Sequence, residues 1–222
     1  MSTKKCTQCI AMSNNGRRCK KKTCKSPYCW IHLKYKLGYR IRPSQLPGAG
    51  DGLWYDPPIK QKVIRGRRES YQDARLRLKL PANTRIPNLK YIAGEREDET
   101  TRAVIDRRYR NKPPAEYVFC DEARDKILRP RDPCVDGYKT NSSFARYINN
   151  KSGKKRNNIR SSGRSRNQGP IQGYKGYTGA IFPNNENPDE GKLQFNFRTL
   201  GKSIMPGTEI KFNYGSNYEL NV

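Results

Sequence analysis

The chain has 222 residues, enough for one domain of moderate size with a small appendage. Only 33% of the residues are hydrophobic, and Gly and Pro number 18 and 15, which predicts many short strands and loops and little long helix. The sequence contains no run of about 18 apolar residues, so a membrane-spanning helix is not expected. The basic N-terminus lacks the apolar core of a signal peptide, so we expect an intracellular protein.

The balance of charge is strongly basic. Lys and Arg number 46 against 20 Asp and Glu, which gives a net charge of +26. Solubility of a small domain needs a net charge of only about 2–8, so this excess predicts attraction to a polyanion. We expect DNA or a nucleosome, association with chromatin in the nucleus, and no membrane partner. The expected phosphate contacts are the loop 151–167 and the insertion near Arg65, Arg67 and Arg68.

Cysteines crowd the N-terminal segment, residues 1–37. Five of the seven lie in the first 29 residues beside the only histidine. An odd number of cysteines in a reducing compartment favours a metal over disulfides. Three thiolates and one imidazole suit tetrahedral zinc, and the ligands that we predict are Cys9, Cys19, Cys29 and His32. Cys6 and Cys24 compete as ligands, because Cys6 stands three residues before Cys9.

The predicted zinc site is structural. Four protein ligands would close the coordination sphere, and no Asp or Glu lies nearby in the sequence to act as a base. The lysines that surround the site also suggest a docking surface. The segment resembles the small Cys-Cys-Cys-His knuckles found at the ends of proteins from large DNA viruses.

The rest of the chain reads as a series of short elements. Residues 71–80, "YQDARLRLKL", are compatible with a helix or, from their alternating leucines, with a strand. Residues 98–110 have an acidic first turn and form the best helix. Residues 151–167 are expected to be a mobile basic loop. Extended chain or strands are expected over 84–95, 115–121, 144–148, 192–200 and 207–215.

Five segments, in the same order, resemble the SET domain of protein lysine methyltransferases. The segments are "GAGDGLWY" (48–55), "PANTRIPNLKYIAGE" (81–95), "EYVF" (116–119), "SFARYINN" (143–150) and "PGTEIKFNYGSNYEL" (206–220). The first resembles the family's Gly-x-Gly-apolar-aromatic turn, and the fourth its Arg-aromatic-Ile-Asn-His core. The resemblance covers residues 45–220. It implies a mostly β fold with few helices, made of short sheets with a knotted C-terminal segment, and an insertion at about 56–80.

By this resemblance the domain transfers a methyl group from S-adenosylmethionine to a lysine. Tyr214 matches the family's catalytic tyrosine, and Tyr91 and Tyr117 are candidate walls of the lysine channel. Glycine lets the backbone approach the cofactor closely because it has no Cβ. An asparagine offers both a donor and an acceptor to the cofactor's amino-acid end. The residues implied at the cofactor are Gly50, Gly52, Leu53, Trp54, Arg146, Asn149, Asn150 and Tyr218.

The chain departs from the family pattern at several positions. Asn150 stands where the family has a histidine, and the asparagine that matches the family's next motif is Asn157 or Asn158. The cysteine-rich segment that often follows a SET domain has no counterpart after residue 134. Tyr218 and Leu220 are therefore expected to complete the lysine channel.

The leading expectation is a methyltransferase that modifies a basic protein, most simply a histone tail on chromatin. A basic tail would be repelled by a chain of charge +26, so we expect the enzyme to meet the tail while docked on nucleosomal or viral DNA. The alternative is a non-catalytic, basic nucleic-acid-binding or chromatin-binding protein, in which a degenerate SET fold serves only as a scaffold.

Overall fold

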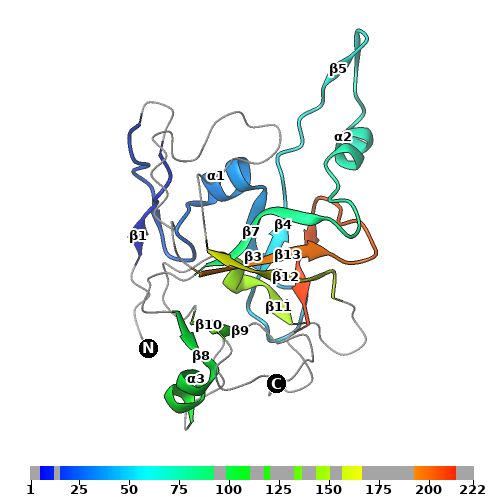
Figure 1. Cartoon of the computed structure of the whole chain (residues 1–222). Coiled ribbons are helices and arrows are strands. Elements are labelled where there is room, and N and C mark those ends of the chain that lie inside the picture. Colours follow the sequence, from blue (N-terminus) through cyan, green and yellow to red (C-terminus); the bar gives the residue numbers. More distant parts are fainter. Residues whose placement is uncertain are drawn as a thin grey trace.

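The computed structural model describes residues 6–12, 16–92, 99–110, 118–120, 133–136, 144–150, 157–166 and 193–213. Within these ranges the chain forms short strands in small sheets, with few helices (Figure 1). The predicted mostly β class is therefore confirmed.

The strands are short because turn residues interrupt the apolar runs. In chain order they are β1 Thr7–Gln8, β2 Lys22–Thr23, β3 Tyr39–Pro43, β4 Asp51–Tyr55, β5 Val63–Ile64, β6 Arg67–Arg68, β7 Arg85–Ile92, β8 Glu99–Thr101, β9 Val118–Cys120, β10 Pro133–Asp136, β11 Asn149–Asn150, β12 Ile159–Arg166, β13 Leu193–Thr199, β14 Thr208–Glu209 and β15 Lys211–Phe212. The helical elements are α1 Trp30–His32, the π-helical turn η1 Leu33–Leu37, α2 Tyr71–Arg77, α3 Arg102–Tyr109 and the 3₁₀ helix η3 Phe144–Tyr147.

Two three-stranded antiparallel sheets form the centre of the molecule (Figure 1). In one sheet, β13 lies between β12 and β7, and its Phe195 and Phe197 are buried. The alternation of "KLQFNFRTL" predicted this strand, and the prediction is confirmed. In the other sheet, β4 lies between β3 and β14 and buries every residue from Gly52 to Tyr55.

A two-stranded parallel sheet joins distant parts of the chain. Asn149 of β11 pairs with Lys211 of β15, and Asn150 pairs with Phe212. Parallel strands cannot be joined by a tight turn, so the chain between them has to cross over. The other strand pairs among the described residues are antiparallel. This one parallel contact places the "ARYINN" and "IKFNYG" segments side by side.

One cluster of buried side chains connects the N-terminal segment to the sheets. It runs from Leu33 through Leu53 of β4 to Phe197 of β13. Tyr28 meets Phe144 edge to face, with ring centroids 6.3 Å apart. The two predicted units therefore share a hydrophobic core, and the boundary between them stays a prediction.

The strand predicted at 144–148 is wrong. Phe144–Tyr147 forms the 3₁₀ helix η3, and only Asn149–Asn150 is a strand. All four residues of η3 are buried, including Arg146. A short run that is buried on every side has no periodicity that separates a helical turn from a strand, so the sequence pattern could not decide between them.

The mobile loop predicted at 151–167 is wrong over Ile159–Arg166. These residues form β12, which pairs with β13 and carries a register shift between Ser161 and Arg164. Ile159 is fully buried. The backbone N–H and C=O groups of β13 need partners, and a polar segment can supply them as well as an apolar one. Residues 151–156 and 167 lie outside the described residues.

The structure also tests the elements predicted at 71–80, 98–110 and 115–121. Residues 71–80 are helical over Tyr71–Arg77, because the Ser70 side chain accepts a hydrogen bond from the N–H of Asp73 and caps the helix. The helix predicted at 98–110 is confirmed over Arg102–Tyr109, after the short strand Glu99–Thr101. The strand predicted at 115–121 is confirmed at Val118–Cys120, and its remaining residues lie outside the described ranges.

The structure separates the cysteines into two kinds. Cys6 and Cys24 form a disulfide, whereas Cys9, Cys19 and Cys29 are free. Cys134 is also disulfide-bonded, and the register of β9 and β10 places it opposite Cys120. The expectation of metal in place of disulfides was therefore wrong for Cys6 and Cys24, which no longer compete as ligands. In the described parts of the chain, no helix has the length and apolar character needed to cross a membrane.

Candidate functional site

The first candidate site lies where two local structures of the N-terminal segment meet. The N–H of Cys9 donates to the carbonyl of Lys21 at 2.9 Å, and that of Cys19 donates to Ala11 at 2.8 Å, so both thiols lie on one antiparallel ribbon. Cys29 precedes the first turn of α1, and His32 ends that turn. Residues three apart on a helix lie on the same face, so the helix presents both side chains to the ribbon.

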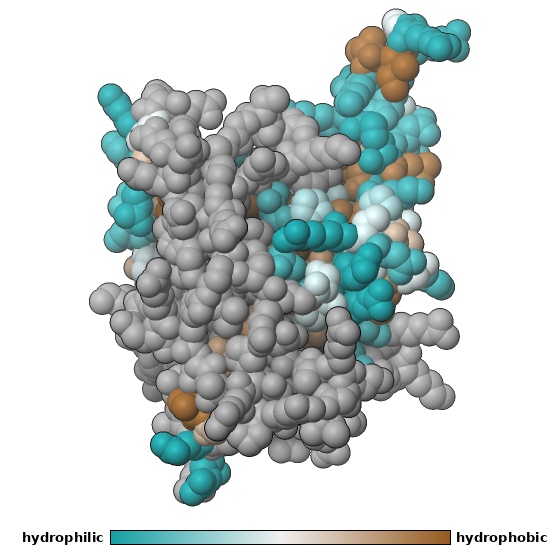
Figure 2. Space-filling model, in the orientation of Figure 1, coloured by the Kyte–Doolittle hydropathy of each residue, from teal (hydrophilic) through white to brown (hydrophobic). Residues whose placement is uncertain are grey.

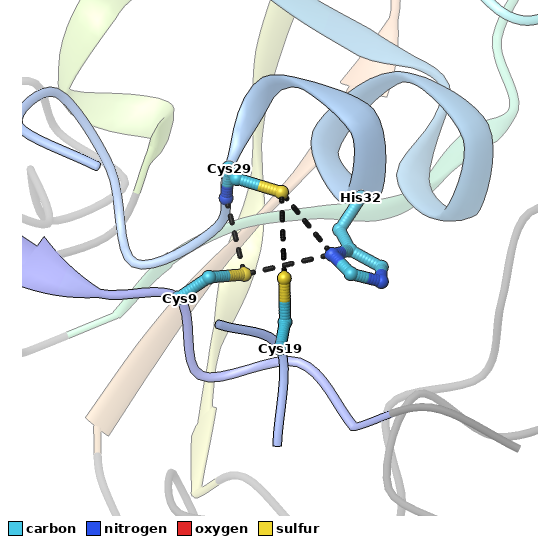
Figure 3. A group of neighbouring side chains, drawn as sticks. All are labelled: Cys9, Cys19, Cys29 and His32. Atoms are coloured by element: carbon cyan, nitrogen blue, oxygen red, sulfur yellow. Dashed lines mark hydrogen bonds between the residues drawn. The ribbon is translucent and has the colours of Figure 1, made fainter. Parts of the chain in front are cut away.

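The four predicted ligands converge (Figure 3). Nδ1 of His32 lies 3.2 Å from Sγ of Cys29 and 3.5 Å from Sγ of Cys9. Sγ of Cys19 lies 4.0 Å from Sγ of Cys29, and all four ligand atoms lie within 4.8 Å of one another. A tetrahedral zinc ion with Zn–S bonds of about 2.3 Å separates its sulfur ligands by about 3.8 Å. The cluster could therefore hold a metal such as zinc.

Burial controls the protonation of this cluster. Burial raises the pKa of Cys9 to about 12, and the neighbouring thiols of Cys29 and Cys19 add to the rise. Hydrogen bonds from the backbone of Cys29 and Ala11 lower the pKa and offset part of this rise. Burial, followed by the charge of Lys36, lowers the pKa of His32. A neutral imidazole is the form that binds metal, and a buried thiolate needs a nearby cation. A divalent metal ion would bind the neutral imidazole and stabilise the buried thiolates.

The four predicted ligands, which we call the metal cluster, lie against the hydrophobic core. Cys9 is 0% exposed and Cys29 is 2% exposed, and both pack in the same cluster of side chains as Leu33. Within the described ranges, no second group of three or more Cys, His, Asp or Glu side chains converges in this way. The four side chains join α1 to the ribbon at the edge of the core.

The second candidate site surrounds the buried side chain of Glu209, which is 1% exposed. Its carboxylate accepts hydrogen bonds from Oγ of Ser44 at 2.5 Å, the N–H of Gln45 at 3.1 Å and Nδ2 of Asn149 at 3.2 Å. Nζ of Lys211 lies 3.6 Å from it. A buried carboxylate is stable only when it is partnered in this way. We call this group the Glu209 cluster; its members are Ser44, Gly52, Asn149, Glu209 and Lys211.

Gly52 fits against this carboxylate. A Cβ at position 52 would lie far inside van der Waals contact with Oε1 of Glu209 and 3.1 Å from Nδ2 of Asn149. The sequence predicted that glycine leaves room for a cofactor here. Protein atoms lie where a Cβ at position 52 would be, so Glu209 by itself requires glycine there, and the role of Gly52 at a cofactor stays a prediction. Gly50 differs, because nothing lies within 4 Å of a Cβ there and its φ of +64° favours glycine.

Asn149 ties the cluster together. Its Nδ2 donates to the carbonyl of Asp51 at 3.3 Å and to Glu209, which uses both amide hydrogens. Asn158 makes a parallel link, because its Nδ2 donates to the carbonyl of Glu209 at 2.7 Å and its Oδ1 accepts from the N–H of Lys211 at 2.8 Å. Among the described residues, Nδ2 of Asn157 donates locally, to the carbonyl of Ile159 at 3.3 Å. Of the two asparagines left open by the sequence, Asn158 therefore contacts the backbone of two members of the Glu209 cluster.

Arg42 and Trp54 lie beside the cluster on the β3–β4 pair. Arg42 is opposite Gly52 in the register, and its guanidinium stacks 3.6 Å from the centre of the Trp54 ring. Nε of Arg42 and Nε1 of Trp54 are buried donors without a hydrogen-bond partner in the described structure. Unpaired buried donors are uncommon in native proteins and call for an acceptor. Lys25 of the N-terminal segment forms an ion pair of 2.6 Å with Asp51, the first residue of β4.

The other predicted site residues divide into three groups. Leu53 is fully buried in the core, and its carbonyl accepts from the N–H of Ile210 at 2.7 Å. Arg146 is buried in η3 and lies 5.3 Å from the ring of Tyr147. Asn150 and Tyr91 lie on described strands, but their side chains are outside the described structure, and so are the whole residues Tyr117, Tyr214, Tyr218 and Leu220.

Sequence reasoning missed Ser44, Arg42 and the role of Glu209. Glu209 lay inside the quoted segment "GTEIKFNYG", where a charged residue between apolar neighbours was the available signal. Ser44 and Arg42 carry no such signal, because only the pairing of β3 with β4 brings them to the cluster. Neither a comparison with protein-family models nor a search of the curated proteins finds a match for this sequence.

Proposed function

We propose that the protein is an S-adenosylmethionine-dependent protein lysine methyltransferase that also binds a structural zinc ion. The observation that carries the proposal is the Glu209 cluster. In it three of the five SET-like segments meet, through Gly52 of the first, Asn149 of the fourth and Glu209 of the last. Short motifs taken singly are weak evidence, and their convergence through defined hydrogen bonds supports the proposal much more strongly.

The residues around the cluster suit the amino-acid end of this cofactor. Because both hydrogens of the Asn149 amide are used within the protein, its Oδ1 remains as an acceptor for an ammonium group. The unpaired donors of Arg42 and Trp54 suit a carboxylate. Together with the backbone near Gly50, these residues would hold the cofactor, which when bound supplies a methyl group on a sulfonium sulfur.

The protein's own part in the reaction is to position the substrate amine and exclude water. Correct orientation of two bound reactants can lower the activation free energy by up to about 7–11 kcal/mol. Tyr214 is the residue after Asn213, where the described part of the last segment ends. In the proposal its hydroxyl orients the lysine amine, and Tyr91 and Tyr117 line the channel. The proposed substrate is a basic protein such as a histone tail, and the net charge of +26 supports docking on DNA or a nucleosome.

Cofactor binding and methyl transfer test the proposal separately. Calorimetry with S-adenosylmethionine reports binding, and labelled cofactor with nucleosomes reports transfer. We expect Tyr214→Phe to abolish transfer and keep binding. We expect Asn149→Ala to weaken cofactor binding about tenfold or more, as the loss of a hydrogen bond to a charged group predicts.

Asn157→Ala is the matched control, because it removes the same amide from a neighbouring position outside the Glu209 cluster. It should leave both readouts unchanged. A wild-type protein that is folded and binds no S-adenosylmethionine would refute the proposal.

The arrangement of the metal cluster supports a structural role for zinc. Four protein ligands would leave no coordination position for water or substrate, and no carboxylate of the described residues belongs to the cluster. Because the ligands join α1 to the ribbon at the edge of the core, bound zinc would add its binding free energy to folding.

A further inference from the structure

A basic hairpin projects from the body of the protein. It consists of β5 and β6, joined by Arg65 and Gly66, and Figure 1 shows it extending beyond the sheets and α2. Residues 60–68 contain five cationic side chains and no acidic one. Every residue from 60 to 68 is exposed. The cations of the hairpin are Lys60, Lys62, Arg65, Arg67 and Arg68.

Both faces of the hairpin combine an apolar side chain with a guanidinium. The register places Val63 opposite Arg68 and Ile64 opposite Arg67, and directly opposed residues share a face. Val63 is 72% exposed and Ile64 is 54% exposed. Figure 2 shows hydrophobic atoms among hydrophilic ones on this projection. Both apolar side chains are more than half exposed, and neither belongs to the cluster of buried side chains among the described residues.

The base of the hairpin is fastened firmly. The carboxylate of Glu69 accepts hydrogen bonds from Nε and Nη2 of Arg77 at 2.9 and 2.8 Å, and from the N–H of Lys62 at 3.1 Å. Nη2 of Arg77 also donates to the carbonyl of Lys60 at 2.8 Å, and the N–H of Glu69 donates to the carbonyl of Lys62 at 2.7 Å. Both strands are thereby held to α2, so the tip stands out on a fixed base.

The turn places a charge where geometry disfavours it. Arg65 has a φ of +49° and Gly66 a φ of +77°, which is the pattern of a type I′ hairpin turn. Asn-Gly is the preferred sequence for such a turn, and a residue with a long side chain adopts positive φ only at a cost. The chain thus keeps an arginine at its outermost point against the local preference for asparagine.

We propose that the β5–β6 hairpin is an arm that binds duplex DNA, with its arginines on the phosphates and its apolar tip in a groove. A two-stranded ribbon fits the major groove, which is about 12 Å wide. Arginine binds phosphate in a bidentate manner. An anionic membrane fits less well, because membrane-surface elements carry Trp, Phe or Leu on their apolar side and residues 60–68 contain none of these. The inference does not depend on methyl transfer.

Salt dependence of DNA binding tests the arm. Fluorescence anisotropy with a labelled duplex gives the slope of log affinity against log salt, which changes by about 0.9 for each phosphate contact. We expect Arg67→Gln with Arg68→Gln to reduce the slope by about 1.8. The matched control is Arg107→Gln with Arg110→Gln, two exposed arginines at the α3 end, far from the hairpin in Figure 1. It removes the same charge, and we expect its slope to stay near that of the wild type.

Two further variants separate charge, turn geometry and apolar contact. Arg65→Asn improves the turn and removes a cation, so we expect equal or higher thermal stability together with weaker DNA binding. Val63→Thr with Ile64→Thr keeps β-branched side chains and should weaken binding about tenfold at unchanged slope, from the lost apolar contact. The proposal would be overturned if the two double-arginine variants had equal slopes, or if the threonine variant bound DNA with wild-type affinity. It would also be overturned if the hairpin were needed for binding to phosphatidylserine vesicles and not for binding to DNA.

Discussion

Replacement of Gly52 by alanine tests the packing of the Glu209 cluster. The new methyl group would overlap Oε1 of Glu209 and press on Nδ2 of Asn149. Glu209 is 1% exposed, so its carboxylate cannot move into solvent without disturbing the β3–β4–β14 sheet. We therefore expect the carboxylate to shift and to lose the two hydrogen bonds that reach Oε1, from Ser44 and Asn149.

The size of the effect follows from those two bonds. A hydrogen bond to a charged group contributes about 1.5–3 kcal/mol, so losing two costs about 3–6 kcal/mol. Alanine in place of glycine returns about 0.5–1 kcal/mol by reducing the entropy of the unfolded chain. The expected net loss for Gly52→Ala is about 2–5 kcal/mol, a large part of the about 5–15 kcal/mol typical of a domain.

Urea unfolding without cofactor measures this loss, and the chain offers a matched control. Gly201 has no heavy atom within 4 Å of a Cβ, so Gly201→Ala should change the free energy of unfolding by less than about 1 kcal/mol. In a Glu209→Ala background the methyl group at position 52 has space, and the cost of Gly52→Ala should fall by at least about 1 kcal/mol. If Gly52→Ala unfolds like the wild type or like Gly201→Ala, the packing argument is wrong.

Three further predictions concern the metal cluster, the disulfide and the base of the hairpin. Cys29→Ser should lower the zinc content from one ion per chain to none, measured with a chromogenic zinc chelator after the protein is unfolded. Cys6→Ser with Cys24→Ser should keep the zinc, because those two cysteines are bonded to each other and are not ligands. The same double variant should weaken hydrogen-exchange protection of the Cys9 and Cys19 amides by up to about 3 kcal/mol, since a disulfide spanning 18 residues constrains the unfolded segment; unchanged protection would contradict this. The hydrogen bonds from Arg77, and then that from the backbone of Lys62, lower the pKa of Glu69 from 4.5 to about 2. The stability that ionised Glu69 gives to the base of the hairpin is therefore complete above about pH 4.5 and is lost as the pH falls through 2. Glu69→Gln should remove this pH dependence from the hydrogen-exchange rates of residues 60–68.

The metal cluster was predictable from the sequence because its ligands are chemically distinctive and close together. Cys9, Cys19, Cys29 and His32 all lie within 24 residues, and a ribbon and one helical turn suffice to bring them together. The pairing of Cys6 with Cys24 was not predictable, because cysteine spacing alone is compatible with either a metal or a disulfide.

The sequence by itself determined the charge, the β-rich class and the local patterns, since these depend on composition and on the alternation along each strand. It predicted β13 from "KLQFNFRTL" and could not predict β12, whose polar residues become a strand only against their partner. Tertiary structure alone decided that Glu209 meets Ser44, Gly52 and Asn149, because these contacts join β4, β11, β14 and the residue that follows β3, which are far apart in the sequence. Such contacts depend on which strands pair, and no local pattern carries that information.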